Sequence, residues 1–293
     1  MIERILGIIL PVFSIVLLGY FYARRVKPDM AVVNHISMNV LAPALVFAAL
    51  ASKDFDMGAN RMLLIGSIAV VLGSGALAWP VARLLNTSAR TFVPPMMFNN
   101  CGNMGLPLAA LAYGTAGFSP MVALFTISNL LQFTLGVWMI DHHAKFGNLA
   151  RNPIVISTVL GFAFAIVHPP LPDWLAVAIK LVGDALIPMM LLSLGVRLYE
   201  VSFDDWRIGV IGGLVRPISG VLIAVLIASL LDLDPIQHGL LILFGSLPPA
   251  VLNFMVAEQF RQEPGKVASI VLIGHVLSIL FVPLALTIAL RPV

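Results

Sequence analysis

Long apolar stretches alternate with short polar connections along the whole chain. Most of them hold about 20 mainly apolar residues, the length that an α-helix needs to cross a bilayer. Charged residues and Gly or Pro clusters separate them, so the pattern predicts ten membrane-spanning helices and no soluble domain. We expect these spans at residues 4–23, 31–51, 62–84, 91–113, 119–140, 151–168, 174–199, 207–231, 236–258 and 266–290.

The composition also favours an all-α membrane protein. Of the 293 residues, 60% are hydrophobic and 11% are charged, whereas soluble domains carry roughly 25% charged residues. The net charge of +3 comes from scattered Lys and Arg residues and not from a basic stripe, which argues against nucleic-acid binding. Cys101 is the single cysteine, so the sequence offers no internal disulfide and no zinc cluster. We therefore expect no metal and no other cofactor.

Basic residues indicate the orientation, because positively charged loops stay on the cytoplasmic side. The apolar run that starts at Ile5 is too long for a cleaved signal, so we expect it to remain as the first span. Both termini are then outside the cytoplasm, in the plasma (inner) membrane, with Arg4, Lys53, Arg61 and Arg291 outside. The cytoplasmic loop ends hold Arg24, Arg25, Lys27, Arg83, Arg90, Lys145, Arg151, Arg197, Arg207, Arg261 and Lys266.

Spans two and seven share a pattern. A basic residue, an Asn or Asp four positions on and a Pro four further recur at His35, Asn39, Pro43 and at Lys180, Asp184, Pro188. Five spans per half is an odd number, so the two halves would cross the membrane in opposite directions, as inverted repeats of transporters do. We expect the repeats at residues 1–143 and 144–293; the alternative is that leucine-rich helices align by chance.

Spans four and nine carry helix-breaking residues about half way along. Span four reads Asn-Asn-Cys-Gly-Asn-Met-Gly-Leu-Pro over 99–107, and span nine reads Gly-Ser-Leu-Pro-Pro-Ala-Val-Leu-Asn over 245–253. Gly exposes the backbone and Pro removes a donor, so neither span should be one continuous helix. Unwound backbone within a membrane is tolerated where it lines a cavity or is buried in protein. The alternative is a pair of kinks that serve packing alone.

A matched pair of breaks in two halves predicts a transporter binding site. The half-helices would point free N–H groups and positive dipole ends at the bound group, which suits a carboxylate. The candidate substrate-binding residues are Asn99, Asn100, Gly102, Asn103, Pro107, Ser246, Pro248, Pro249 and Asn253.

Ionisable residues inside spans are candidates for ion coupling, since a charge at the bilayer centre costs about 2.5 kcal/mol or more. Asp184 lies near the middle of span seven with Lys180 one turn before it, so the two either neutralise each other or help to bind a proton or sodium. Arg216 either pairs with Asp184, meets an anionic substrate or extends toward the headgroups. His275 is either a proton carrier or a hydrogen-bonded packing residue.

Enzymatic motifs are absent from the sequence. It contains no Gly-x-Ser-x-Gly elbow, no phosphate-binding loop and no metal-binding His pair with further ligands. We therefore expect that the protein is not an enzyme.

Three short motifs resemble the auxin efflux carrier family, which includes plant auxin carriers and bacterial carriers labelled malonate or malate permeases. Two of them lie in the broken spans and one in span seven: Asn100-x-x-Asn103-Met104-Gly105-Leu106-Pro107-Leu108, Leu247-Pro248 with Phe254-x-x-Ala257-x-x-Phe260, and Ser193-Leu194-Gly195.

The resemblance implies a fold similar to bile-acid transporters and sodium/proton antiporters, in which spans four and nine cross at their unwound prolines. It implies a scaffold of spans one, two, six and seven, a core of spans three to five and eight to ten that moves against it as an elevator, and a homodimer. Asn253 stands where plant members tend to have proline, so we expect the crossing in span nine at Pro248 or Pro249.

The sequence thus favours a secondary carrier of small organic anions, such as auxin-like or dicarboxylic acids, that works by alternating access. A proton, sodium or no ion at all would be coupled to transport. Two alternatives stay open: a sodium/proton antiporter on the same scaffold, and a membrane sensor that has lost transport.

Overall fold

The structure is a computed structural model that describes residues 2–52, 55–56, 58–141, 151–167, 169–200 and 205–290. Within these ranges every regular element is a helix, and the one extended pairing is an isolated bridge between Asn99 and Pro249. The prediction of an all-α protein is therefore confirmed. Of the basic residues used for orientation, Lys53, Lys145 and Arg291 lie outside the described residues.

The helices of the first half follow the predicted spans closely. They are α1 (Ile2–Val26), α2 (Ala31–Ile36), the π-helical turn η1 (Ser37–Leu41), α3 (Ala42–Leu50), α4 (Arg61–Leu84), α5 (Ala89–Met97), η2 (Cys101–Gly105), α6 (Leu106–Leu131), η3 (Gln132–Gly136) and α7 (Val137–Ile140). The second half holds α8 (Pro153–Val167), α9 (Asp173–Asp184), α10 (Leu186–Glu200), α11 (Trp206–Leu230), α12 (Pro235–Ser246), α13 (Val251–Gln259) and α14 (Pro264–Ala289).

Seven helical segments of the described chain are long and apolar enough to cross a membrane. They are Ile2–Val26, Ala31–Leu50, Arg61–Leu84, Cys101–Ile140, Asp173–Tyr199, Trp206–Leu230 and Pro264–Ala289. The sequence predicts ten spans. The number of long apolar helices is smaller because α8 is short and because breaks divide predicted spans four and nine into shorter helices.

Gly114 interrupts the longest of these segments. Its φ of +63° and ψ of −147° lie where L-residues are strongly disfavoured, so this position requires glycine. A straight helix from Cys101 to Ile140 would measure about 60 Å, twice the hydrocarbon thickness of about 30 Å. The break at Gly114 therefore separates predicted spans four and five.

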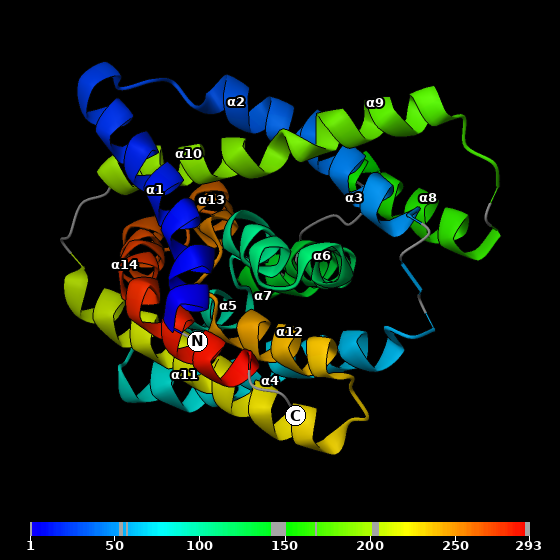
Figure 1. The fold of residues 1–293 in the computed structure, drawn as a ribbon. Helices are drawn as coiled ribbons and strands as arrows, with labels where there is room; N and C mark the ends of the chain where they lie inside the picture. Colours follow the sequence, from blue (N-terminus) through cyan, green and yellow to red (C-terminus); the bar gives the residue numbers. More distant parts are fainter. Residues whose placement is uncertain are drawn as a thin grey trace.

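The helices form two groups with the broken helices between them (Figure 1). In that view α2, α3, α9 and α10 run along the top with α8 beneath them, α1 descends from the upper left toward the centre, and α4, α11 and α12 lie at the bottom. α1 packs on α10 and α3 packs on α8, while α11 packs on α4, α12 and α14. α5, α6, α7 and α13 occupy the space between the groups, so the two breaks are enclosed by protein.

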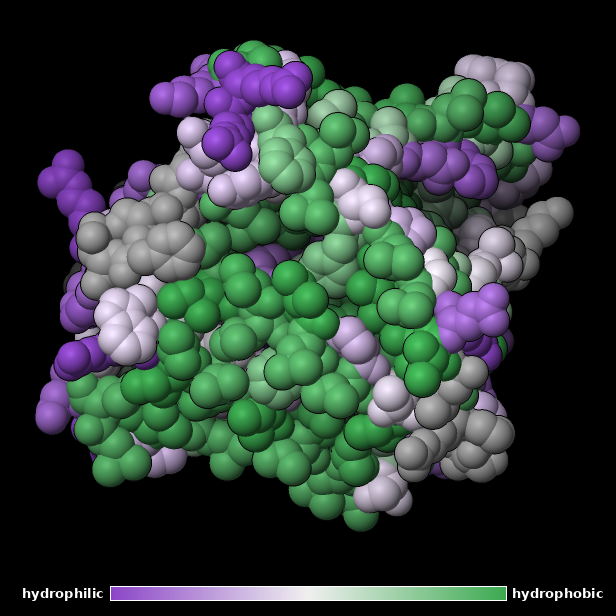
Figure 2. Space-filling view, turned by 60° about the vertical axis from the view of Figure 1, so that its left-hand side comes forward, coloured by the Kyte–Doolittle hydropathy of each residue, from purple (hydrophilic) through white to green (hydrophobic). Residues whose placement is uncertain are grey.

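The outer surface is apolar over a wide area. Figure 2 shows a broad hydrophobic face with hydrophilic residues gathered mainly at its margins. A soluble monomer rarely exposes such a surface, whereas lipid covers it at no cost. The exposed apolar side chains include Leu17, Leu18, Leu181, Leu222, Leu226, Ile279 and Leu280.

Candidate functional site

The two helix breaks cross each other through main-chain hydrogen bonds. α5 ends at Met97 and α12 at Ser246, and the residues that follow each are extended. The N–H of Asn100 donates to the oxygen of Pro248 at 2.7 Å, and the N–H of Ala250 donates to the oxygen of Phe98 at 2.9 Å. This antiparallel pairing satisfies backbone groups that would otherwise be stranded inside the protein.

Each broken helix also closes the end of the other with an asparagine. The side-chain amide of Asn99 donates to the oxygen of Phe244 in α12 at 2.6 Å, and that of Asn253 donates to the oxygen of Phe98 at 2.9 Å. The last carbonyl groups of a helix lack partners within the helix, so these amides supply them. The two breaks therefore form one structural unit.

Arg216 lies behind the crossing with none of its surface exposed. Its Nη1 donates to the oxygen of Gly245 at 3.3 Å, and its Nε and Nη2 have no hydrogen-bond partner among the described residues. The guanidinium thus meets the negative end of the α12 dipole. α11 comes this close because Gly220 faces Gly245, where a Cβ on either would overlap the other's carbonyl.

His275 on α14 orients the amide of Asn100. Its Nδ1 lies 2.7 Å from the oxygen of Val271 and must donate there, so its Nε2 accepts from Nδ2 of Asn100, also at 2.7 Å. The Oδ1 of Asn100 is thereby directed to the N–H of Asn103, at 3.2 Å, and caps the start of η2. His275 therefore controls which end of this amide faces the half-helix.

A cavity of about 750 Å³, counting the space at its mouth, lies between the crossing and helices α2, α8 and α10. At its inner end are Asn99, Asn100 and the first residues of η2 and α13. Its side walls carry the polar residues Asn34, Ser37, Ser128, Asn129, Gln132, Ser193 and Arg197.

The cavity continues toward the far end of α13. A second hollow shares Met38, Ile154 and Met255 with it and extends to Arg151 and Glu258. Arg151 is one of the residues expected on the cytoplasmic side.

Four of the predicted site residues line the cavity: Asn99, Asn100, Gly102 and Asn103. Pro248, Pro249 and Asn253 instead build the crossing itself. Ser246 is fully buried and donates within α12 to the oxygen of Leu243.

The prediction that span four unwinds at Pro107 is wrong. The extended residues come earlier, at 98–100, and Pro107 is buried near the start of α6. A proline there does no harm, because the first residues of a helix need no N–H partner and the π-helical turn before it already widens the backbone. The unwound residues therefore include Asn99 and Asn100 and not this proline.

The structure also shows where two of the ionisable residues lie. Arg216 neither pairs with Asp184 nor extends toward the headgroups, because it is enclosed and bound to Gly245. Asp184 pairs instead with Lys180 at 2.7 Å, with side chains 53% and 69% exposed on α9 and outside the cavity. Lys180 and Asp184 thus form the ion pair that one of the two alternatives expects, and their part in ion coupling stays a prediction.

Sequence reasoning missed the polar residues on the cavity walls. Ser193 and Arg197 are one turn apart on α10, and Ser128 and Gln132 are one turn apart at the end of α6. Polar pairs at this spacing on otherwise apolar helices share a face. That spacing was a usable signal for a polar cavity.

Comparison with known proteins shows similarity over nearly the whole chain. A family model described as "Membrane transport protein" matches residues 4–148 and 146–286. A Rhizobium meliloti protein with the provisional name malonate transporter is 28% identical over 94% of this chain and 93% of its own length. An uncharacterized transporter of Methanothermobacter thermautotrophicus is 26% identical over 94% and 95%. Auxin efflux carrier component 6 of Arabidopsis thaliana is 25% identical over 45% of this chain and 24% of its own.

Proposed function

Because the chain belongs to the membrane transport protein family that includes auxin efflux carriers, we propose that it is a secondary carrier of small organic anions. The relatives' names refer to malonate and to auxin, both of which carry a carboxylate. The proposal rests mainly on one feature of this chain, the cavity that ends at two half-helix N-termini.

The electrostatics of that cavity suit an anion. Val251 begins α13 without a side-chain cap and lines the cavity together with Leu252, so the positive end of this helix dipole lies at the cavity. Arg197 is the charged residue among the described residues that line the cavity. A sodium/proton antiporter needs a carboxylate at its ion site, so this lining favours the organic-anion carrier over that alternative.

We also propose that the chain forms ten spans in two inverted repeats, at residues 1–143 and 144–293. The packing supports this. The first span of each half packs on the second span of the other half, because α1 packs on α10 and α8 packs on α3. Likewise α4 packs on α5 as α11 packs on α12. If the two halves are interchanged, each contact of a pair takes the place of the other, which is what a two-fold pseudo-symmetry requires.

Alternating access would then come from movement of one helix group against the other. The cavity lies between α2, α8 and α10, which belong to the expected scaffold, and the crossing, which belongs to the expected core. On the opposite side Arg4 of α1 donates to the oxygen of Ala112 in α6 at 3.0 Å, which joins the two groups there. A homodimer formed through the scaffold is part of the same proposal.

For ion coupling we propose His275 in place of the Lys180–Asp184 pair. His275 hydrogen-bonds a cavity-lining residue, and a proton on its Nε2 would force Asn100 to turn its amide. A proton on His275 would add a positive charge to a region that already holds a buried cation, Arg216 on the adjacent α11. We expect His275→Gln to flatten the dependence of uptake on a proton gradient and Asp184→Asn to leave it unchanged; the reverse result contradicts this assignment.

Transport in proteoliposomes tests the proposed function. Exchange of radiolabelled malonate and indole-3-acetate is measured for the wild type, for Asn103→Ala in the cavity, and for Thr287→Ala on the exposed face of α14 as a matched control. We expect Asn103→Ala to lose exchange and Thr287→Ala to keep it. Binding of these acids without flux would indicate a sensor, and sodium-driven pH change without an organic anion would indicate the antiporter.

A further inference from the structure

We propose that Arg4 and Arg151 are positioning residues that alternately hold the core against the scaffold during transport. Arg4 holds the arrangement seen here, in which the cavity adjoins an open hollow at Arg151 and Glu258. Arg151 holds the opposite arrangement, in which that hollow is closed. This inference rests on the proposed function, because it takes alternating access and the two inverted repeats from it. It adds the residues that set the balance between the two states.

The outer contact joins Arg4, in the first turn of α1, to the end of a half-helix. α6 is interrupted at Gly114, so the half-helix that begins at Leu106 ends beside Ala112. The guanidinium of Arg4 donates to the oxygen of Ala112 at 3.0 Å. The cation therefore meets the negative end of the half-helix dipole, where a positive charge is favourable.

The end of this half-helix is fixed to the rest of the core. Tyr113 donates its hydroxyl to the oxygen of Ala289 in α14 at 2.8 Å. Gly239 of α12 lies beside it, and a Cβ at that position would overlap the tyrosine oxygen. Arg4 belongs to α1, which is part of the expected scaffold, so its bond to Ala112 crosses the boundary between the two groups. Movement of the core against the scaffold would have to break this bond.

Arg151 occupies the corresponding place in the second half of the chain. It lies two residues before α8, the first span of that half, as Arg4 lies in the first turn of α1. α13 is the half-helix that follows the second break, and Ala257 in its last turn comes 145 positions after Ala112. The same separation relates the patterns of spans two and seven. Inverted repeats therefore match Arg151 with the end of α13, as they match Arg4 with the end of the first half-helix.

The partners of this inner contact line one hollow without pairing. Arg151 lines it from the scaffold, and Glu258 in the last turn of α13 lines it from the core. The structure gives no ion pair between these two residues. Glu258 adds a carboxylate to the negative end of the α13 dipole, so closure of the hollow would give Arg151 a partner of opposite charge. The outer contact is thus formed while the inner one is open, as alternating access requires.

Local helix chemistry does not account for either arginine. A cation at the start of a helix faces the positive end of the dipole, which is unfavourable. Arg4 is also expected on the outer side, where basic residues are less frequent than in cytoplasmic loops. Arg151 has a competing explanation, since a cytoplasmic arginine can serve orientation in the membrane alone. That explanation predicts no effect of Arg151 on the balance between two states of the folded protein.

The accessibility of a cavity cysteine from each side measures this balance. Cys101 is the single cysteine, so Cys101→Ala removes it, and Met38→Cys places a reporter that lines both the cavity and the hollow. A membrane-impermeant methanethiosulfonate reagent is added to right-side-out and to inside-out vesicles that carry the full chain. The measured quantity is the ratio of the labelling rate from the cytoplasmic side to that from the outer side.

Arg61→Gln at the start of α4 and Arg90→Gln in α5 are the matched controls. Both arginines are exposed, belong to the expected core and line neither the cavity nor the hollow. They remove the same charge from the outer and the cytoplasmic side without touching the proposed contacts. Both controls should leave the labelling ratio unchanged.

The two arginines should shift the ratio in opposite directions. We expect Arg4→Gln to lower it about two- to tenfold, which is the effect of losing one hydrogen bond on an equilibrium. Arg151→Gln should raise it by a similar factor, and Glu258→Gln should change it in the same direction as Arg151→Gln. The variant that combines Arg4→Gln with Arg151→Gln should return close to the ratio of the reporter protein.

Three results would overturn the inference. A shift in the same direction for Arg4→Gln and Arg151→Gln shows a general effect of charge. Ratios equal to those of the controls show that neither contact sets the balance. Absence of labelling from the outer side in every variant refutes alternating access itself. The labelling needs no substrate, so a failure of organic-anion exchange in proteoliposomes refutes the proposed substrate class separately.

Discussion

The side chain of Asn253 in α13 is joined to the main chain of Phe98, at the end of the other broken helix, by a hydrogen bond of 2.9 Å. The same amide donates to the oxygen of Ala250 at 3.0 Å, and its Oδ1 accepts from Nε2 of Gln132 at 2.9 Å. Asn253 is almost fully buried, so these hydrogen bonds are shielded from water. One side chain therefore connects the two breaks to the helix that lines the cavity.

Replacing Asn253 should loosen the crossing. We expect Asn253→Ala to lower the free energy of unfolding by about 1 to 3 kcal/mol, because Gln132 is left buried without its acceptor. Thermal unfolding of the detergent-purified protein measures this, with Ser229→Ala as the control, since exposed Ser229 bonds only within its own helix. Equal melting temperatures for the two variants would contradict the importance of this amide.

We expect the buried Arg216 to lower the stability of the fold and to support transport. A fully buried guanidinium with one neutral acceptor pays a desolvation penalty of several kcal/mol. Arg216→Met removes this penalty at the loss of one hydrogen bond, so we expect it to stabilise the fold by about 1 to 3 kcal/mol. We also expect transport to fall, because the negative end of α12 at the crossing loses its cation.

The two measurements for Arg216→Met are the melting temperature and uptake in proteoliposomes. A large decrease in the melting temperature would show that the charge is compensated within the fold. Unchanged uptake would show that the crossing does not need the cation.

We expect that no other residue can replace Gly114 without strain, because of its backbone conformation. We expect Gly114→Ala to destabilise the protein by about 1 to 3 kcal/mol, since its φ and ψ lie in a region that L-residues avoid. Gly7 in α1 is the matched control, because a Cβ would meet no atom within 4 Å at either position and Gly7 has no positive φ. Gly7→Ala should be neutral or stabilising, as alanine favours a helix; similar losses for both variants would refute the argument.

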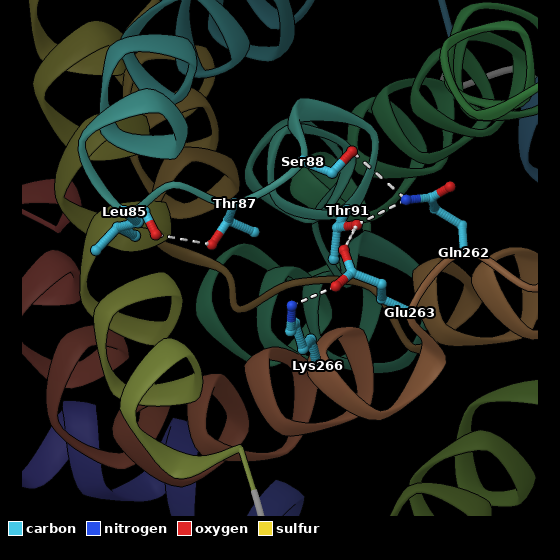
Figure 3. A network of polar contacts seen from close by, with 7 residues as sticks. All are labelled: Leu85, Thr87, Ser88, Thr91, Gln262, Glu263 and Lys266. Atoms are coloured by element: carbon cyan, nitrogen blue, oxygen red, sulfur yellow. Dashed lines mark hydrogen bonds and ion pairs between the residues drawn. The ribbon is translucent and has the colours of Figure 1, made fainter.

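Glu263 should make stability depend on pH in the acid range. Figure 3 shows its carboxylate between Lys266 and Thr91, and Thr91 Oγ1 donates to it at 2.5 Å. The hydrogen bonds from Lys266 and then Thr91 lower the pKa of Glu263 below its ordinary value of 4.5, while burial opposes this. The ionised group therefore stabilises the fold above that value, and the contribution is lost as the pH falls through the lower folded-state pKa.

Melting temperatures of the wild type and Glu263→Gln across the acid range check this prediction. The difference between the two should be largest near neutral pH and should shrink as the pH falls. It should be small, because Glu263 and Lys266 are partly exposed. A difference that grows with acidification would give the opposite sign and contradict the prediction.

The helix breaks were predictable because their causes are local. Amide, Gly and Pro residues at 99–107 and 245–253 disfavour a continuous helix whatever surrounds them. The position of the first crossing was not predictable, since Pro107 fits into α6 and the extended residues lie at 98–100. Which of several breaking residues is used depends on the partner segment, here Leu247–Ala250, that supplies the missing hydrogen bonds.

By itself the sequence determined that this protein is helical, that it is a membrane protein and which two spans are broken, because span length, hydropathy and helix-breaking chemistry belong to short segments. Only the tertiary structure decided what the polar residues do. Lys180 and Arg216 both lie within apolar helices, yet one is exposed beside Asp184 and the other is enclosed against Gly245. Depth along a helix follows from residue number, but exposure depends on which face another helix covers, and that is set by contacts between segments far apart in the chain.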